Sequence, residues 1–397
     1  MNRNQIISYL KRHPKVLSLF WNVSSVILKC ASPIIPVRKS IVFSSFGGRK
    51  YDDSPRALYE AICADPFFQD WSLVWAFVEP EKFKLPRGSI EKIDTITFFK
   101  TLLGSHIWIS NSGMTRGIKI HKKGIIEVET WHGTPLKKIG GDENQNSMLT
   151  KRDIEKRERA KLDRSTIRCA QSEFDKEIFS RIFHADKDAI LTCDLPRNDE
   201  LLKFDKKICD IKNALGIAAD KKVILYTPTY REYLVDDSNS IYLAPPITLT
   251  KWEKELGSDY VLLIRAHYAV NNALNLRDSD FVKNVSDYPT INDLYAISDL
   301  MISDYSSTFI DYSILEKPML CFAYDLEEYE QKRGLYLELD KVLPCVIDKD
   351  EDALICHIKQ INYGEASART KEFRQLYAPN AGNACNAVIT AIKKRLP

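Results

Sequence analysis

The stretch LMISDYSSTFIDYSILEKPMLCFAYD, residues 300–325, decides the fold class. It holds two short apolar runs, each ending in polar residues, with a helical segment between them. Runs of this kind are typical of strands buried on both faces of a sheet, and such strands run parallel when helices connect them. The stretch therefore predicts a parallel β-α-β unit.

The same pattern recurs along the chain in two series. A helix is expected between Asp53 and Ala64, where Ser54 and Pro55 mark its start. The expected strands are 40–46, 72–78, 106–111, 124–131, 166–172 and 189–195 in the first series, and 222–230, 260–267, 300–307 and 318–325 in the second. The two series predict an α/β protein with two doubly wound domains that face a central cleft.

Length and composition agree with two domains, since the chain has 397 residues and 44% of them are hydrophobic. We expect a first domain at 37–205, a second at 206–378, and a C-terminal helix at 379–397 that crosses back to the first domain. The net charge of +3 gives no sign of nucleic-acid binding. Nine cysteines without a CxxC pair indicate reduced thiols rather than disulfides or a zinc site.

Residues 1–36 form a separate segment whose uncharged stretch, from Val16 to Leu28, lies between basic clusters. The stretch is too short to span a bilayer, which takes about 20 apolar residues. We expect a helix that associates with an anionic membrane surface through side chains such as Phe20 and Trp21. The alternative is a helix packed on the body of the protein. A secretory signal is not favoured, because no convincing cleavage pattern follows.

Polar side chains gather at the ends of the expected strands, which is where open α/β sheets bind ligands. His132 ends a strand of the first series and His267 ends one of the second. Asp304 also ends a strand, and Ser306 and Ser307 follow at the expected start of a helix. Hydroxyls and backbone N–H groups at a helix start suit a phosphate. The sequence thus offers one histidine per domain and an anion site in the second.

Each motif also has a structural explanation when it is taken alone. A strand-end histidine is more often structural than catalytic, and SDYSS can be a helix cap and turn. The segment YTPTYR, with Thr229 and Arg231, can be a turn that carries an exposed arginine, and Lys137 and Lys138 can be surface charge. Five such motifs at strand ends of one two-domain α/β protein favour a binding site more strongly than any single one.

Several stretches together resemble a known family. They are YDDSPRALYEAI (51–62), WHGTPLKKIG (131–140), LPRNDELL (195–202), YTPTYR (226–231), IRAH (264–267) and the long run from Asn292 to Tyr336. In this order they resemble the CDP-glycerol glycerophosphotransferases, which make teichoic-acid and related capsule polymers. The likeness extends over most of the chain after residue 40.

The resemblance implies a GT-B architecture, with the acceptor side in the first domain and the donor nucleotide in the second. It implies transfer of glycerol phosphate from CDP-glycerol to a hydroxyl of a lipid-linked saccharide or polymer, with release of CMP, at the cytoplasmic face of the cell membrane. Matched motif to motif, the implied donor contacts are His132, Gly133, Thr134, Pro135, Leu136, Arg197, Pro228, Thr229, Arg265, Ala266, His267, Ser306, Ser307 and Asp311.

In that reaction the acceptor hydroxyl must lose a proton as it attacks phosphorus, and a histidine suits this task because its pKa is near neutrality. We assign His132 as the general base, and we expect His267 to stabilise charge that builds toward the CMP leaving group. The residues expected to orient the phosphates are Arg197, Arg231, Ser306 and Ser307. No cofactor is required, although Asp304 and Asp311 leave room for a divalent cation.

Three alternatives stay open. The donor can be CDP-ribitol, or the protein can be a nucleotide-sugar glycosyltransferase that releases UDP and forms a glycoside. A catalytically silent membrane-bound scaffold of a polymer-export assembly is the alternative outside the enzymes, and it would not turn over CDP-glycerol. The charged segment 142–164 is expected to be a solvated face or an element that covers the substrate.

Overall fold

The computed structural model describes residues 14–115, 118, 120, 122–143, 166–204, 207–229, 231, 245–266 and 276–397. These residues divide into two compact units. The first takes the described residues of Met1–His132, Asp163–Cys169 and Cys385–Pro397, and the second those of Gly133–Leu162 and Ala170–Ala384. The peptide bond between His132 and Gly133 is thus a boundary between the units, within the WHGTP motif.

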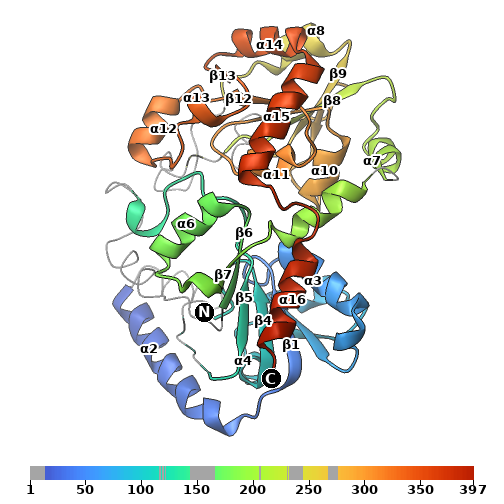
Figure 1. Cartoon of the computed structure of the whole chain (residues 1–397). Helices are drawn as coiled ribbons and strands as arrows, with labels where there is room; N and C mark the ends of the chain where they lie inside the picture. The colour runs from blue at the N-terminus through green and yellow to red at the C-terminus, as the bar shows by residue number, and fades with distance from the viewer. Residues whose placement is uncertain are drawn as a thin grey trace. The chain divides into compact units, whose positions relative to one another are not determined.

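The first sheet has seven strands (Figure 1). Their order is β3 (Ser89–Lys92), β2 (Ser72–Phe77), β1 (Arg38–Ser44), β4 (Ser105–Ser110), β5 (Ile126–Glu129), β6 (Thr166–Ala170) and β7 (Ile190–Thr192). Successive residues of β1 point to opposite faces. Phe43 meets Tyr59 of helix α3 (Asp53–Ala64), with 5.3 Å between ring centroids, whereas Val42 lies in a cluster with Phe98 of helix α4 (Ile96–Gly104).

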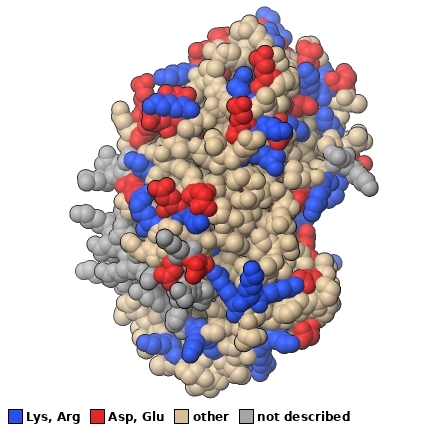
Figure 2. Space-filling view, in the orientation of Figure 1, with Lys and Arg blue, Asp and Glu red and all other residues tan. Residues whose placement is uncertain are grey.

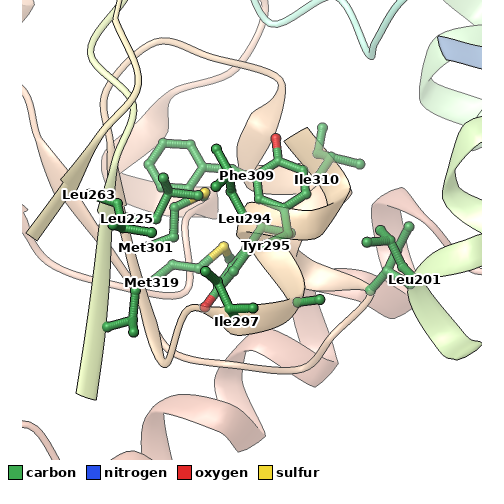
Figure 3. Close-up of a cluster of buried hydrophobic side chains, with 14 of the residues drawn as sticks. Leu201, Leu225, Leu263, Leu294, Tyr295, Ile297, Met301, Phe309, Ile310 and Met319 are labelled. Atoms are coloured by element: carbon green, nitrogen blue, oxygen red, sulfur yellow. The ribbon is translucent and has the colours of Figure 1, made fainter. Parts of the chain in front are cut away.

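The second sheet has six strands. Their order is β10 (Val282–Asn284), β9 (Tyr260–Ile264), β8 (Lys222–Tyr226), β11 (Leu300–Ser303), β12 (Met319–Phe322) and β13 (Ile347–Asp348). Leu225, Leu263 and Met301 enter the core cluster drawn in Figure 3. Their neighbours Ile224 and Ile302 enter a different cluster on the opposite face. Burial on both faces explains why these strands read as unbroken apolar runs.

The second unit contains most of the described helices. One core cluster takes side chains from α7 (Ile208–Ala214), α10 (Ile291–Ile297), α11 (Thr308–Ser313), α12 (Leu326–Lys332), α13 (Leu339–Val342) and α15 (Tyr363–Tyr377). The other takes them from α8 (Leu249–Leu256) and α14 (Glu351–Gln360). Helix α6 (Glu173–Ile182) also belongs to this unit, while α2 (Pro14–Ala31) and nearly all of α16 (Ala384–Arg395) belong to the first. The structure is therefore an α/β fold with two parallel sheets.

The strand order of both sheets reverses beside their first strand. In the first sheet the chain runs outward from β1 to β3 and then returns to β4, and in the second it runs from β8 to β10 and returns to β11. Such switch points leave a crevice at the carboxyl ends of the two central strands, which is where doubly wound sheets bind ligands. The residues after β1, β4, β8 and β11 are therefore the first to consider as a site.

All ten expected strands are present, and most of them are shorter than expected because their polar ends lie in the loops that follow. Three strands were missed, namely β3, β10 and β13, and each lies at an edge of its sheet. Edge strands are half exposed, so SIEK of β3 has no buried residue and gives no apolar signal. The expected helix at 53–64 matches α3.

The surface carries both signs of charge, which Figure 2 shows interspersed on the face drawn, in keeping with the small net charge of the sequence. Among the described residues, no helix is long and apolar enough to cross a bilayer. Helix α2 has an unusual exposed side, with Leu19 and Val26 at 64% and 61% exposure. Val16, Val23 and Ile27 of α2 are also exposed. Their spacing of three or four places them on one face of the helix.

Candidate active site

His132 belongs to the first unit and is held at the switch point of the first sheet. Its Nδ1 lies 3.1 Å from the carbonyl oxygen of Asn111, the residue that follows β4. A carbonyl oxygen only accepts hydrogen bonds, so Nδ1 carries the hydrogen in this contact and the lone pair lies on Nε2. The imidazole is exposed, and it stacks on the ring of Trp131 with 4.6 Å between centroids. The arrangement presents an oriented imidazole that can accept a proton at Nε2.

Trp131 is itself positioned by buried charge. Its backbone has a φ of 57°, which is costly for a bulky side chain and requires support from its surroundings. The guanidinium of Arg168 lies 5.0 Å from the centroid of the Trp131 ring. Arg168 and Glu129 form a buried pair at 4.0 Å, and Ser110 donates to Glu129 at 2.9 Å. These contacts fix the platform on which His132 stacks.

Gly133 opens the second unit with a conformation that only glycine adopts readily, since its φ is 144°. A Cβ atom at this position would lie 2.4 Å from Oγ of Ser307 and 3.7 Å from a guanidinium nitrogen of Arg197. The hydroxyl of Ser307 and the guanidinium of Arg197 therefore lie close to the backbone of Gly133, on the side where other residues carry a Cβ. We call this side the bare face of Gly133. Convergent donors of this kind suit a phosphate group.

The turn after Gly133 is anchored on both sides. Thr134 is buried, and its hydroxyl lies 3.0 Å from Oε1 of Gln171 and 3.0 Å from Oδ2 of Asp175. Pro135 is buried, and the side chain of Leu136 lies in the hydrophobic core of the second unit. The carbonyl of Leu136 accepts from the backbone N–H of Tyr336 at 2.8 Å. The side chain of Leu136 therefore packs in the core, where it anchors the turn.

Arg197 and Asp311 form a close ion pair at the same place. The guanidinium donates to Oδ2 of Asp311 at 2.6 Å, and Asn292 donates to the backbone carbonyl of Arg197 at 2.7 Å. The other oxygen of Asp311 accepts from Asn198 at 2.8 Å and from Gln171 at 3.2 Å. The carboxylate of Asp311 is thus occupied by protein donors, and its effect on a ligand would pass through Arg197.

Arg231 is buried between two carboxylates and does not reach solvent. It donates to Asp325 at 2.7 and 2.8 Å and to Asp304 at 2.9 Å. Its guanidinium also lies 4.7 Å from the ring centroid of Tyr305. Although burial raises the pKa of Asp325, the hydrogen bond and charge of Arg231 outweigh it and hold that pKa below its usual value.

This ion triad fixes the ends of the two central strands of the second sheet. Asp304 follows β11, and its carboxylate accepts from the backbone N–H of Thr229, which follows β8, at 3.0 Å. The geometry therefore favours a role for Arg231 in positioning this loop, rather than a role in direct contact with phosphate.

Replacing Arg231 with methionine should destabilise the protein strongly. Asp304 and Asp325 would stay buried without their counter-ion, and breaking a buried pair in this way costs about 3–5 kcal/mol of unfolding free energy. Arg56→Met is a matched control, because Arg56 forms a partly exposed pair with Glu60 whose loss should cost less than about 1 kcal/mol. Denaturant unfolding measures both, and equal losses in the two variants would contradict the buried role of Arg231.

The remaining expected residues lie around the same strand ends, with one exception. Pro228 is buried, Arg265 donates to the carbonyl of Tyr288 at 2.7 Å, and the N–H of Ala266 donates to Ser286 at 3.0 Å. His267 lies outside the described residues, as does most of the charged segment 142–164.

The serine pair differs from expectation in one respect. Helix α11 begins at Thr308, but the side chain of Ser307 makes no capping hydrogen bond. Instead, the hydroxyl of Ser306 accepts from the N–H of Thr308 at 3.3 Å. The cap assigned to the pair is therefore made by Ser306 alone, and the hydroxyl of Ser307 faces Gly133.

Within the described ranges, no group of three or more His, Cys, Asp or Glu residues is arranged to hold a metal ion. Asp304 and Asp311, the two carboxylates considered for a cation, are each paired with an arginine.

The sequence interpretation missed the residues behind the site. These are Gln171, Asp175, Asp194 and Asn198, and all four are buried. Gln171 and Asp175 form hydrogen bonds with Thr134, and Gln171 and Asn198 donate to Asp311. Asp194 accepts from Gln171 and Asn198. Gln171 is the last but one residue of the expected strand 166–172, and Asn198 lies within LPRND. The signal available was therefore the clustering of polar residues at the end of a buried strand. Nothing in the spacing of the chain indicates that they meet.

Donor groups that converge after parallel strands are a feature that α/β proteins use to bind phosphate groups. The chain belongs to the CDP-glycerol:poly(glycerophosphate) glycerophosphotransferase family, whose model matches residues 28–394. A teichoic acid glycerol-phosphate transferase of Staphylococcus aureus is 33% identical over 374 residues, which is 91% of this chain and 94% of that protein.

Two further comparisons agree. A teichoic acid poly(glycerol phosphate) polymerase of Staphylococcus epidermidis is 34% identical over 333 residues, which is 82% of this chain but only 46% of the polymerase. The solved structure of the wall teichoic acid polymerase TagF matches with a TM-score of 0.83 and 28% identity, covering 100% of this chain and 98% of the TagF chain.

Proposed function

We propose that this protein transfers glycerol phosphate from CDP-glycerol to a hydroxyl of a lipid-linked acceptor and releases CMP, in the synthesis of a teichoic-acid or capsule polymer. The observation that carries the proposal is the bare face of Gly133, on which Ser307 and Arg197 converge, in a chain of the glycerophosphotransferase family. The names of its relatives from two staphylococci support glycerol phosphate as the transferred group. CDP-ribitol is the alternative donor.

His132 acts as the general base in this proposal. The acceptor hydroxyl gives its proton to Nε2 while its oxygen attacks the phosphorus that carries glycerol, and the bond from that phosphorus to the CMP oxygen breaks. The bond of Nδ1 to Asn111 supports this role, because it sets the tautomer that leaves the lone pair on Nε2. His267 would stabilise the negative charge of the departing CMP.

The second unit would hold the donor. The backbone N–H of Gly133, the hydroxyl of Ser307 and the guanidinium of Arg197 would bind the diphosphate, since all three lie within one small region. We further propose a GT-B arrangement of the two units, supported by the likeness to TagF over the whole chain.

Product analysis tests the proposal. The purified protein is given CDP-glycerol, CDP-ribitol or UDP-sugars with a lipid-linked saccharide acceptor, and the products are identified by mass. We expect CMP and a phosphodiester-linked alditol. Release of UDP with a glycoside would favour the glycosyltransferase alternative, and turnover of no donor would favour the scaffold.

We also propose that the protein works as a peripheral protein at the cytoplasmic face of the cell membrane, with α2 as its contact. The exposed apolar face of α2 and the basic residues that flank it in the sequence suit an anionic bilayer. Each nearby cation adds about 1 kcal/mol of attraction at such a surface.

Deleting residues 1–36 should release the protein from anionic vesicles and leave turnover of a short soluble acceptor largely unchanged. Within the intact chain, Leu19→Glu with Val26→Glu should do the same, because both substitutions place charge on the exposed apolar face. The control pair Ile96→Glu with Leu376→Glu adds equal charge at exposed apolar sites elsewhere and should sediment like the wild type. High salt should weaken but not abolish binding of the wild type. Unchanged sedimentation of the α2 variants would place the anchor elsewhere, and failure of the deletion to fold would favour a packed helix.

A further inference from the structure

Behind the Gly133 turn, the second unit contains a buried hydrogen-bonded cluster centred on Gln171. The side-chain amide nitrogen of Gln171 donates to Asp194 at 2.8 Å and to Asp311 at 3.2 Å. Its oxygen accepts from the N–H of Thr134 at 3.2 Å and from the Thr134 hydroxyl at 3.0 Å. One side chain therefore connects the turn at Gly133 to the carboxylate that holds Arg197.

Two carboxyl groups complete this cluster. Asp175 accepts from the backbone N–H of Gln171 at 2.9 Å and contacts the Thr134 hydroxyl. Asp194 accepts at one oxygen from Gln171, from Asn198 at 3.2 Å and from the N–H of Leu195 at 2.7 Å. Within the described part of the chain, Oδ1 of Asp175 and Oδ2 of Asp194 are buried with no hydrogen-bond partner.

The charges of the cluster do not balance if every carboxyl group is ionised. Asp175, Asp194 and Asp311 are three buried acids, and Arg197 is the cation that, among the described residues, is hydrogen-bonded to the cluster. Burial raises the pKa of Asp194 to about 7, and the charge of Asp311 adds to the shift. Burial likewise raises the pKa of Asp175 to about 7, and the charges of Asp194 and Asp311 act in the same direction.

We propose that Gln171, Asp175 and Asp194 are positioning residues of the donor site: they set the Thr134 turn and, through Asp311, the guanidinium of Arg197. The proposal rests on the proposed function, since it assumes that the turn and Arg197 bind the donor diphosphate. Gln171 forms hydrogen bonds with Thr134 in the turn and with Asp311, which holds Arg197. Loss of its amide donor should therefore displace the turn and Arg197 together.

The same cluster gives donor binding a pH dependence. The groups that face it are Asp175 on α6, Asp194 and Arg197 around the start of η6 (Pro196–Lys203), Asp311 on α11 and the phenol of Tyr295 on α10. When Asp175 and Asp194 are protonated, the charge of Arg197 is opposed by Asp311 alone. When they ionise, added negative charge disfavours an anionic ligand. Donor affinity should therefore be highest below about pH 7 and fall as the pH rises through it.

The test replaces Gln171 with glutamate and measures the Kd of CDP-glycerol by calorimetry at about pH 6 and pH 8. Protonated glutamate can donate one of the two hydrogen bonds of the glutamine amide, but ionised glutamate donates none and places a further negative charge against Asp194 and Asp311. We expect the affinity of Gln171→Glu to fall between the two pH values by about tenfold more than that of the wild type. Gln360→Glu adds the same charge at an exposed position of α14 and should follow the wild type.

Asp194→Asn is the second variant, because asparagine keeps the accepting oxygen and does not titrate. It should reduce the pH dependence of the Kd below that of the wild type, whether or not Gln171→Glu folds. A pH dependence in both variants equal to that of the wild type would overturn the positioning role. Absence of CDP-glycerol binding by the wild type would instead contradict the proposed function, and the positioning role with it.

Discussion

Replacing His132 with alanine is expected to lower turnover about 10²-fold or more, the usual contribution of a general base, while donor binding and the fold persist. The imidazole is exposed and makes its described contacts with Trp131 and Asn111, so its removal leaves no cavity in a core. Single-turnover release of CMP from CDP-glycerol, with acceptor in excess, measures the chemical step.

His357→Ala provides the control, because His357 is a partly exposed histidine paired with Asp348 on the second unit. Its removal should leave turnover near that of the wild type. If folded His132→Ala turned over at the wild-type rate, His132 would have no part in the proton transfer. A lower donor affinity with unchanged turnover would make it a binding residue.

Gly133→Ala should also abolish most of the activity, for a steric reason. The new Cβ would lie 2.4 Å from Oγ of Ser307, and alanine rarely adopts a φ of 144°. The turn must then move away from Ser307 and Arg197, and a misplacement of about 1 Å at such a site can cost 10²-fold in rate. We expect turnover to fall by about 10²-fold or more, with weaker binding of CDP-glycerol.

Gly124→Ala separates backbone strain from the clash. Gly124 has a φ of 86°, and no atom of the described residues lies within 4 Å of the position that a Cβ would take there, so this variant carries strain without contact. It should retain most of its activity. The double variant Gly133→Ala with Ser307→Gly lacks the clashing hydroxyl. Its thermal stability should therefore be higher than that of Gly133→Ala, but its affinity for CDP-glycerol should not recover. Wild-type activity of Gly133→Ala would show that the close approach at Gly133 is not needed.

The strands and the family motifs could be predicted because they depend on local sequence. Leu225 and Ile224, on opposite faces of β8, are both buried, and this gives the unbroken apolar run that predicts a central parallel strand. The edge strands β3, β10 and β13 carry no such run, and they were missed. His132 could be singled out because it ends such a strand beside a glycine.

The partners of the site residues could not be predicted, because they come from distant parts of the chain. Arg231 reads as an exposed cation in YTPTYR, yet Asp304 and Asp325 enclose it from 73 and 94 residues further along. Asp311 was expected to contact the nucleotide donor, yet the side chain of Gln171, 140 residues earlier, donates a hydrogen bond to one of its oxygens. Such pairings depend on the packing of the second sheet and its loops, which motif spacing does not specify.

The central claim is that the Gly133 turn, Ser307 and Arg197 hold the donor diphosphate. A crystal structure with CDP-glycerol, obtained with His132→Ala to prevent turnover, tests it most directly. We predict that diphosphate oxygens lie within hydrogen-bond distance of the backbone N–H of Gly133, of Oγ of Ser307 and of the guanidinium of Arg197. A diphosphate bound away from all three, with the Gly133 turn unoccupied, would contradict the account.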